Sequence, residues 1–294
     1  MTKFSPSDAA MEGFRLTKEH PGVMLAWSAV YLGGILLIGL VMMATLGPPF
    51  ISLIRKGQLG SPEDVDNLAT MLAQSWPAFL LLLLMTALLM SIITGGVMRL
   101  VLRPEEHGFA HLKVSRTELK LTAANLLCIG IGALSMMVGI VFTAGAAQTG
   151  SIGATVAVGL FLAFALWIGV RLSLLLPTVF DTGQISLRLA WDKTRGHFWQ
   201  LLGMIVLAVI FYLIVWILFG MIGFAVVELS GGEAAMQDLT RITPVTAIAA
   251  VISLVLQFLL WVLQIVMIYA PFAVAYRELV LEDAPPAPPA VEVA

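Results

Sequence analysis

Six long apolar segments constrain the fold of this chain more than any other feature of its sequence. They occupy approximately residues 23–46, 77–101, 120–146, 153–178, 199–227 and 245–276. Each approaches or exceeds the roughly 20 residues that an α-helix needs to cross the hydrocarbon core of a bilayer. At 60% hydrophobic and 12% charged, a soluble chain of 294 residues could not hide its apolar surface from water. The sequence therefore predicts an all-α fold, a polytopic transmembrane bundle of six helices.

The polar stretches divide the chain into three parts. Residues 1–21 form a polar N-terminal segment, and residues 22–277 form the six-helix transmembrane domain. Residues 278–294 form a tail whose Ala-Pro-Pro-Ala-Pro-Pro-Ala run is typical of extended, disordered chain. Short interfacial helices are expected at about 8–20, 62–75 and 184–198.

Two short motifs suggest internal repetition. Phe14-x-x-Thr17-Lys18-x-His20 precedes the first apolar segment, and Trp191-x-x-Thr194-Arg195-x-His197 precedes the fifth. This spacing suits three stacked helical hairpins, each introduced by a surface helix. The alternative is that similar positions at a membrane interface select similar residues.

The basic residues are divided unequally between the two sides of the predicted membrane. If the N-terminus is cytoplasmic, only Arg55, Lys56 and Arg241 of the sixteen Lys and Arg residues lie outside. The inside residues are Lys3, Arg15, Lys18, Arg99, Arg103, Lys113, Arg116, Lys120, Arg171, Arg188, Lys193, Arg195 and Arg277. By the positive-inside rule, both termini are expected in the cytoplasm. A net charge of -2 gives no reason to expect a nucleic-acid partner.

Arg171 is a candidate contact for a lipid phosphate or another anion. An ionisable residue inside a spanning segment is a functional hypothesis by default. Arg171 falls near the inner end of the fourth segment, where its long side chain can also reach the interface. It can therefore bind an anion, pair with an acid such as Asp181, or serve only as an interfacial anchor.

The run 184–198 has the pattern of an amphipathic surface helix. One face carries mainly apolar residues, and the other carries Arg188, Lys193 and Arg195. Such a helix suits anionic lipid, so these three residues are candidate lipid contacts. Anchoring to the membrane surface and a regulatory role both fit this pattern.

The sixth segment contains a polar face that includes Gln257 and Gln264. Amide groups are costly against lipid, so this face is expected to point into the bundle. The two glutamines could line a polar cavity or form hydrogen bonds between helices.

The sequence lacks the motifs of common catalytic sites. It contains no HExxH motif, no glycine-rich phosphate loop and no recognisable Ser/His/Asp set. His107 and His111 are four residues apart, but Pro104 and Gly108 oppose the continuous helix that would align them. We expect no enzymatic activity, no metal site and no cofactor.

The chain resembles a broad family of uncharacterised bacterial inner-membrane proteins. The resemblance rests on Arg171-Leu172-Ser173-x-x-x-Pro177 and on Ala190-Trp191-x-x-Thr194-x-Gly196-x-Phe198-Trp199-x-Leu201, with Met98-Arg99-x-x-Leu102-Arg103-Pro104-Glu105-Glu106 as a further match. These segments are similar to YciC-type proteins and to the membrane domain of some glycerophosphoryl diester phosphodiesterases. The resemblance implies a six-helix protein of the bacterial inner membrane. It does not imply phosphodiesterase activity, because the chain has no room for the catalytic barrel.

The sequence thus favours a non-enzymatic membrane protein that organises, senses or assists lipids or partners at the cytoplasmic face. Membrane lipids are the expected partners, with other proteins or a second copy of the chain as further candidates. The alternative is a transporter or lipid-handling channel that uses Arg171, Gln257 and Gln264.

The expected topology can be tested with reporter fusions. A fluorescent protein that folds only in the cytoplasm should fluoresce when fused to either terminus. Alkaline phosphatase inserted between residues 147 and 152 should be active, because this turn is expected on the outside. The opposite pattern of the two reporters would reverse the topology.

Overall fold

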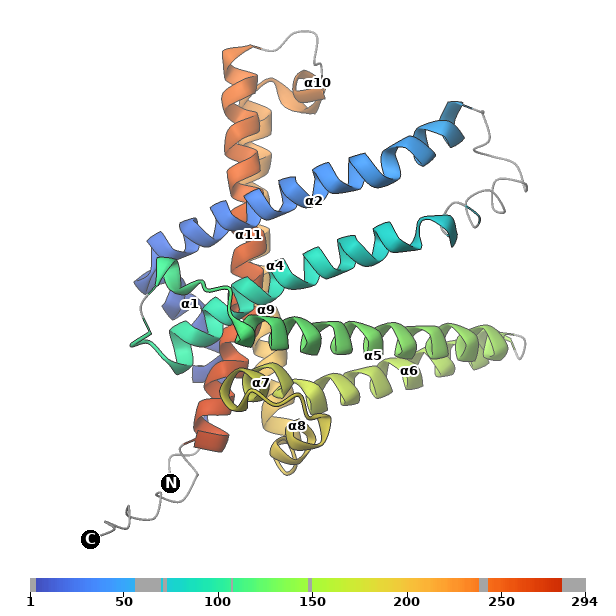
Figure 1. Ribbon diagram of the computed structural model, residues 1–294, viewed down its shortest axis with the longest axis vertical. Helices are drawn as coiled ribbons and strands as arrows, with labels where there is room; N and C mark the ends of the chain where they lie inside the picture. The colour runs from blue at the N-terminus through green and yellow to red at the C-terminus, as the bar shows by residue number, and fades with distance from the viewer. Residues whose placement is uncertain are drawn as a thin grey trace.

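A computed structural model of the protein describes residues 4–55, 70, 73–106, 108–147, 150–237 and 243–281. The regular elements in these ranges are all helices, which confirms the predicted fold class (Figure 1). In chain order they are α1 (Pro6–Glu19), α2 (Pro21–Arg55), α4 (Trp76–Leu102), η1 (Phe109–His111), α5 (Arg116–Ala147), α6 (Ser151–Leu172), α7 (Leu175–Thr182), α8 (Leu187–Lys193), α9 (Phe198–Leu229), α10 (Gly232–Gln237), α11 (Pro244–Tyr276) and the π-helix η2 (Arg277–Leu281).

Six helices are long and apolar enough to cross a membrane, as the sequence predicts: α2, α4, α5, α6, α9 and α11. Large apolar side chains along them are exposed, including Leu40 at 69%, Met137 at 66% and Phe224 at 67%. Water would penalise such surfaces, whereas lipid tails are as apolar as the side chains themselves. Length, composition and exposure together indicate an integral membrane protein.

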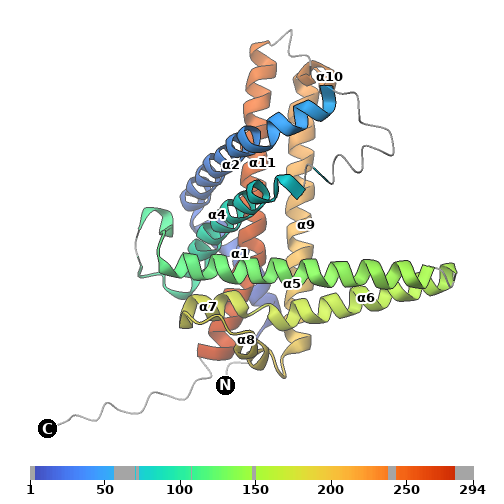
Figure 2. The same ribbon diagram turned by 45° about the vertical axis from the view of Figure 1, so that its right-hand side comes forward.

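The spanning helices form three antiparallel hairpins: α2 with α4, α5 with α6, and α9 with α11. Figures 1 and 2 show that the hairpins share one end and spread apart toward the other. We call the shared end the base and the opposite ends the tips. Helices α1, α7 and α8 lie at the base, while α10 lies at the tip of the third hairpin. The three predicted hairpins are therefore present, but they diverge from the base.

Helix α1 matches the predicted N-terminal helix, and its apolar face packs on other helices. The hydroxyl of Ser5 accepts a hydrogen bond from the Asp8 backbone N–H at 3.5 Å and caps the helix start. Ala9, Gly13 and Leu16 are buried, because α1 lies against α9 and the C-terminal part of α11. Packing of α1 on α11 also brings the two described ends of the chain to the same end of the molecule.

The fourth apolar segment is a candidate membrane span over Ile152–Thr182, which includes the predicted span 153–178, but its helix is interrupted at residues 173–174. Helix α6 stops at Leu172, and α7 begins at Leu175 in a new direction. Pro177 explains the break, because its ring would clash with the carbonyl of residue 173 and it lacks an N–H to donate. The Ser173 hydroxyl instead bonds to the Val170 carbonyl at 2.8 Å.

The predicted helix 184–198 is also shorter in the structure, where α8 covers only Leu187–Lys193. The Ser186 hydroxyl accepts a hydrogen bond from the Leu189 N–H at 3.3 Å, which sets the helix start. Gly196 has a φ of 92°, a left-handed conformation that favours glycine and ends the helical run before α9.

Two further predictions fall largely outside the described residues. Most of the helix expected at 62–75 lies in the ranges 56–69 and 71–72, which the structure does not describe. Helix η2 extends regular structure to Leu281, four residues into the predicted tail, and residues 282–294 lie outside the described chain.

The packing of α1 on α11 can be tested at Gly13. A Cβ atom on Gly13 would lie 2.8 Å from the Met267 Cα, a backbone atom that cannot rotate away. Gly13→Leu should therefore lower the free energy of unfolding by about 1–3 kcal/mol, measured by thermal unfolding in detergent. A Cβ on Gly203 of α9 meets nothing within 4 Å, so Gly203→Leu should not destabilise the protein. Equal effects of the two substitutions would contradict this packing.

Candidate functional site

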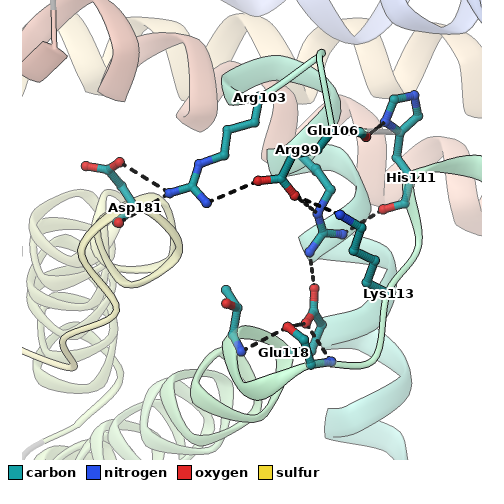
Figure 3. A network of polar contacts seen from close by, with 9 residues as sticks. Arg99, Arg103, Glu106, His111, Lys113, Glu118 and Asp181 are labelled. Atoms are coloured by element: carbon teal, nitrogen blue, oxygen red, sulfur yellow. Dashed lines mark hydrogen bonds and ion pairs between the residues drawn. The ribbon is translucent and has the colours of Figure 1, made fainter. Parts of the chain in front are cut away.

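A buried ion pair joins the first two hairpins at the base. Arg99 on α4 is 3% exposed and donates to the carboxylate of Glu118 on α5, which is fully buried (Figure 3). Arg99 Nη1 also donates to the His111 carbonyl at 2.6 Å, and the Ser115 N–H donates to Glu118 Oε2 at 2.9 Å. These bonds supply both charges with partners, which a buried ion pair requires to be stable.

Two glycines and a tryptophan let the α4–α5 connection lie against α4. A Cβ on Gly95 would lie 3.3 Å from Glu118 Oε1, and one on Gly96 would lie 2.9 Å from a Leu112 methyl. Side chains at these positions would push the connection away from α4. Trp27 of α2 donates its indole N–H to the Ala110 carbonyl at 2.7 Å and holds the connection from the other side. Ala110 is in the left-handed region at φ 48°, so the surrounding contacts maintain a strained turn here.

Glu106 extends the network toward the surface. Its carboxylate accepts from Lys113 Nζ at 3.0 Å and from Arg103 Nη1 at 3.4 Å. Chiefly the hydrogen bond from Lys113, and then the charges of Lys113 and Arg103, lower the pKa of Glu106 despite its partial desolvation. Arg99 Nε lies 3.3 Å from Glu106 Oε2, but the atoms are not aligned for a hydrogen bond. Glu106 therefore remains ionised, and its carboxylate lies close to the three cations Lys113, Arg103 and Arg99.

Asp181 and Tyr276 connect this network to the third hairpin. Tyr276 at the end of α11 donates its hydroxyl proton to Asp181 Oδ2 at 2.8 Å, and Lys193 of α8 donates to the Tyr276 oxygen at 2.8 Å. Arg103 reaches the Asp181 carboxylate at 3.8 Å, so the charged chain runs from α4 through α7 to α11. Burial lowers the pKa of Lys193, and the nearby Asp181 charge opposes this shift.

The base network therefore ties all three hairpins together. We use this name for Arg99, Arg103, Glu106, His111, Lys113, Ser115, Glu118, Asp181, Lys193 and Tyr276. Its acids are each bonded by at least one cation or hydroxyl. Within the described part of the chain, no group of three or more His, Cys, Asp or Glu could hold a metal ion. This arrangement of ion pairs and hydrogen bonds suits a structural role, in which the network holds the three hairpins together at the base.

Arg171 lies beside this network and is not part of it. It occupies the last turn of α6, and its guanidinium carbon lies 5.4 Å from the centre of the Trp191 ring. Its Nε and Nη1 atoms are buried and have no hydrogen-bond partner. The suggested pairing of Arg171 with Asp181 is wrong, because Asp181 is held by Tyr276 and Arg103. Two guanidinium nitrogens of Arg171 thus lack a hydrogen-bond acceptor among the described residues.

The other candidates from the sequence do not form one cluster. Arg188 and Arg195 are exposed on and just after α8, whereas Lys193 is engaged with Tyr276. Gln264 accepts a hydrogen bond from the Tyr212 hydroxyl of α9 at 3.3 Å, which is the cross-helix role considered for it. The expectation that the polar face of α11 points into the bundle is wrong at Gln257, whose side chain is exposed and lines a cavity of about 270 Å³ between α9 and α11.

The comparisons with known proteins complete this description. The fold and the distribution of charge define a class, the six-helix integral membrane protein in which most charged residues of the described chain lie at one end. No protein-family model, curated protein or solved structure matches the chain. Any function must therefore be argued from the chain's own geometry.

The role of Glu118 was missed from the sequence although a signal for it exists. Ser115-Arg116-Thr117-Glu118 has the S-x-x-E spacing of a capping box, which places a Glu in the first turn of a helix. In the structure, the Glu118 carboxylate accepts from the Ser115 backbone N–H as this motif requires. No sequence signal identifies Arg99 as the second partner, because that contact depends on how α4 meets α5.

The buried pair can be tested by a double-mutant cycle. Glu118→Leu removes the buried carboxylate that Arg99 bonds to and leaves only the half-exposed Glu106 as its counter-charge, so it should cost about 3–5 kcal/mol of unfolding free energy. Combining it with Arg99→Met should restore most of that loss, because no uncompensated charge remains. Chemical unfolding in detergent would measure both effects. As a control, Glu19→Ala breaks only the exposed pair with Arg15 and should cost less than about 1 kcal/mol. Additive losses in the double mutant would show that the two side chains act independently.

Proposed function

We propose that this protein is a non-enzymatic component of the bacterial inner membrane that organises, senses or assists lipids or protein partners at the cytoplasmic face. One observation carries the proposal: apart from Arg55, Glu228 and Glu233 at the tips, the charged groups of the described chain lie at the base, while the spanning shafts expose almost continuous apolar surface. Among the described residues, the base therefore carries most of the charged surface.

The distribution of cations supports a cytoplasmic base. The described Lys and Arg residues lie in α1, in the base ends of the spanning helices and in the connections there, apart from Arg55 at the end of α2. Basic residues near membrane-spanning segments remain on the cytoplasmic side during insertion. The resemblance to bacterial inner-membrane proteins suggests the same location.

The surface around α8 suits contact with anionic lipid headgroups. We call Arg188, Arg195 and Trp199 the α8 surface. Both arginines are exposed, and the Trp199 side chain is 79% exposed at the start of α9. Tryptophan favours the membrane interface, and each basic residue near an anionic surface contributes about 1 kcal/mol of attraction. Lys193 is a weaker candidate for lipid contact, since its ammonium group already bonds to Tyr276.

The α8 surface can be tested by neutralising its charges. Arg188→Gln combined with Arg195→Gln should reduce the enrichment of anionic phospholipid or of a partner protein that is extracted with the protein in native membrane patches. Mass spectrometry of the extracted patches would measure both. Arg55→Gln removes a charge from the tip end of α2 and should leave the enrichment unchanged. If the double variant retained the same lipids and partners as the wild type, the proposal would fail.

A second function, a transporter or lipid-handling channel, is favoured by the unpaired polar atoms in the spanning region. Two nitrogens of Arg171 and the Ser253 hydroxyl are buried without hydrogen-bond partners. Ser253 and Gln257 line the cavity between α9 and α11. Replacing Arg171, Gln257 and Gln264 with apolar residues should change solute or lipid accumulation if this function is correct. Unchanged accumulation would leave the non-enzymatic proposal.

A further inference from the structure

A cavity of about 520 Å³ lies between α5, α6 and α11, and the α8 surface does not include it. Its volume falls within the roughly 300–1,000 Å³ typical of small-molecule sites. Fifteen residues line it: Asn125, Cys128, Ile131, Gly132, Ser135, Met136, Phe161, Ala165, Ile168, Gly169, Leu172, Ser173, Leu176, Tyr269 and Phe272. The cavity is therefore mainly apolar, with a few polar groups contributed by α5, by Ser173 after the end of α6, and by α11.

The contacts between α5 and α6 determine where this cavity ends. Toward the tip, the two helices meet closely, because a Cβ on Gly139 would lie only 2.4 Å from the Phe161 ring. Toward the base, the cavity reaches Ser173 at the break between α6 and α7. The stretch from Phe161 to Ser173 spans roughly 18 Å at 1.5 Å per residue. The cavity is thus elongated along the hairpin and closed at its tip end by an aromatic ring.

The polar groups of the cavity are concentrated toward the base. Asn125 donates its amide to Ser91 at 2.7 Å, and no hydrogen bond from a described residue reaches its side-chain oxygen. The Tyr269 hydroxyl, on the opposite wall, likewise makes no hydrogen bond to another described residue, so it can donate to a ligand. The portion near Phe161 and Met136 is mainly apolar, with Ser135 as its polar lining residue. The cavity therefore changes from polar to apolar along its length.

The cavity is open to the surroundings at its side. Gly132 and Gly169 are exposed, Met136 is 62% exposed, and a Cβ on either glycine would meet nothing within 4 Å. Because these helices face lipid, a molecule that enters here comes from the bilayer. A glycerophospholipid has the chemistry for both ends, because an ester carbonyl can accept a hydrogen bond from Tyr269 and an acyl chain is as apolar as the other end.

We propose that the cavity between α5, α6 and α11 is a lateral binding site for one acyl chain and the ester region of a glycerophospholipid. This inference does not depend on the α8 surface, since none of the three residues of that surface lines the cavity. Binding gains no hydrophobic free energy over the bilayer, because lipid tails are equally apolar. Specificity must come from close packing and from the hydrogen bonds at the polar end.

Photo-crosslinking in defined vesicles tests the proposal. The protein is reconstituted in phosphatidylethanolamine and phosphatidylglycerol with a trace of phosphatidylglycerol that carries a diazirine on one acyl chain. After irradiation, adducts should concentrate on residues 128–136 and 161–172 compared with the exposed shafts of α2 and α9. Adducts spread evenly over all lipid-facing helices would overturn the site.

Two matched variants distinguish an effect of filling the cavity from an effect of placing a large side chain anywhere on α5. Gly132→Phe should fit without a clash, occupy the cavity and reduce the local adducts roughly tenfold, as expected when one or two hydrogen bonds are lost. Gly130 is equally exposed and unobstructed but does not line the cavity, so Gly130→Phe should leave the adducts unchanged. Equal effects of the two variants would count against the site.

A chemical arm needs no substitution. Cys128 lines the cavity and is the one cysteine of the chain, so a short alkyl methanethiosulfonate should modify it selectively. Modification should suppress the local adducts, and a reductant should restore them.

Competition by unlabelled phosphatidylglycerol supports a phospholipid, whereas competition by free fatty acid alone would overturn that assignment. The Arg188→Gln, Arg195→Gln variant should keep the adducts, so failure of the function proposed for the α8 surface can be told apart from failure of this one.

Discussion

The buried ion pair between Arg99 and Glu118 is the contact on which the arrangement of the hairpins most depends. Placing two charges out of water is costly, and this cost is offset only when each charge has further hydrogen-bond partners beside the other. Here the bonds come from the α4–α5 connection itself, through the His111 carbonyl and the Ser115 N–H. The same connection joins the first hairpin to the second. Charge pairing and chain direction are therefore linked, and the base cannot rearrange without exposing an unpaired charge.

The three hairpins are joined at the base and separate from one another toward their tips. The hairpins diverge from the base, so their shafts expose much apolar surface to lipid. Where α11 crosses the second hairpin near the base, the gap between α5 and α6 becomes a cavity with both polar and apolar parts. The base network and this cavity are thus two consequences of one architecture. The first fixes the hairpins, and the second gives lipid a place to enter between them.

Particular residues show where sequence reasoning stopped being reliable. The Ser115-x-x-Glu118 motif can be recognised in the sequence. The buried partner of Glu118, however, is Arg99, which lies 19 residues earlier on another helix. Pro177 is evident in the sequence, but its presence did not predict that the helix would be interrupted within the fourth segment. Ser186 and Gly196 limit α8 to seven residues where the amphipathic pattern suggested fifteen. Arg171 was correctly placed near a helix end, but the acid suggested as its partner was already bonded by Tyr276 and Arg103.

The sequence by itself determined the helical class, the six spanning segments and the separation of basic residues toward one end. These properties depend on local composition and segment length, because each helix satisfies its own backbone hydrogen bonds in lipid. Only the tertiary structure decided which charges meet. Tyr276 and Asp181 are 95 residues apart in the chain, and their contact requires α7 to bend toward the end of α11. The cavity likewise depends on the angles between three helices, and no periodicity in the sequence encodes those angles.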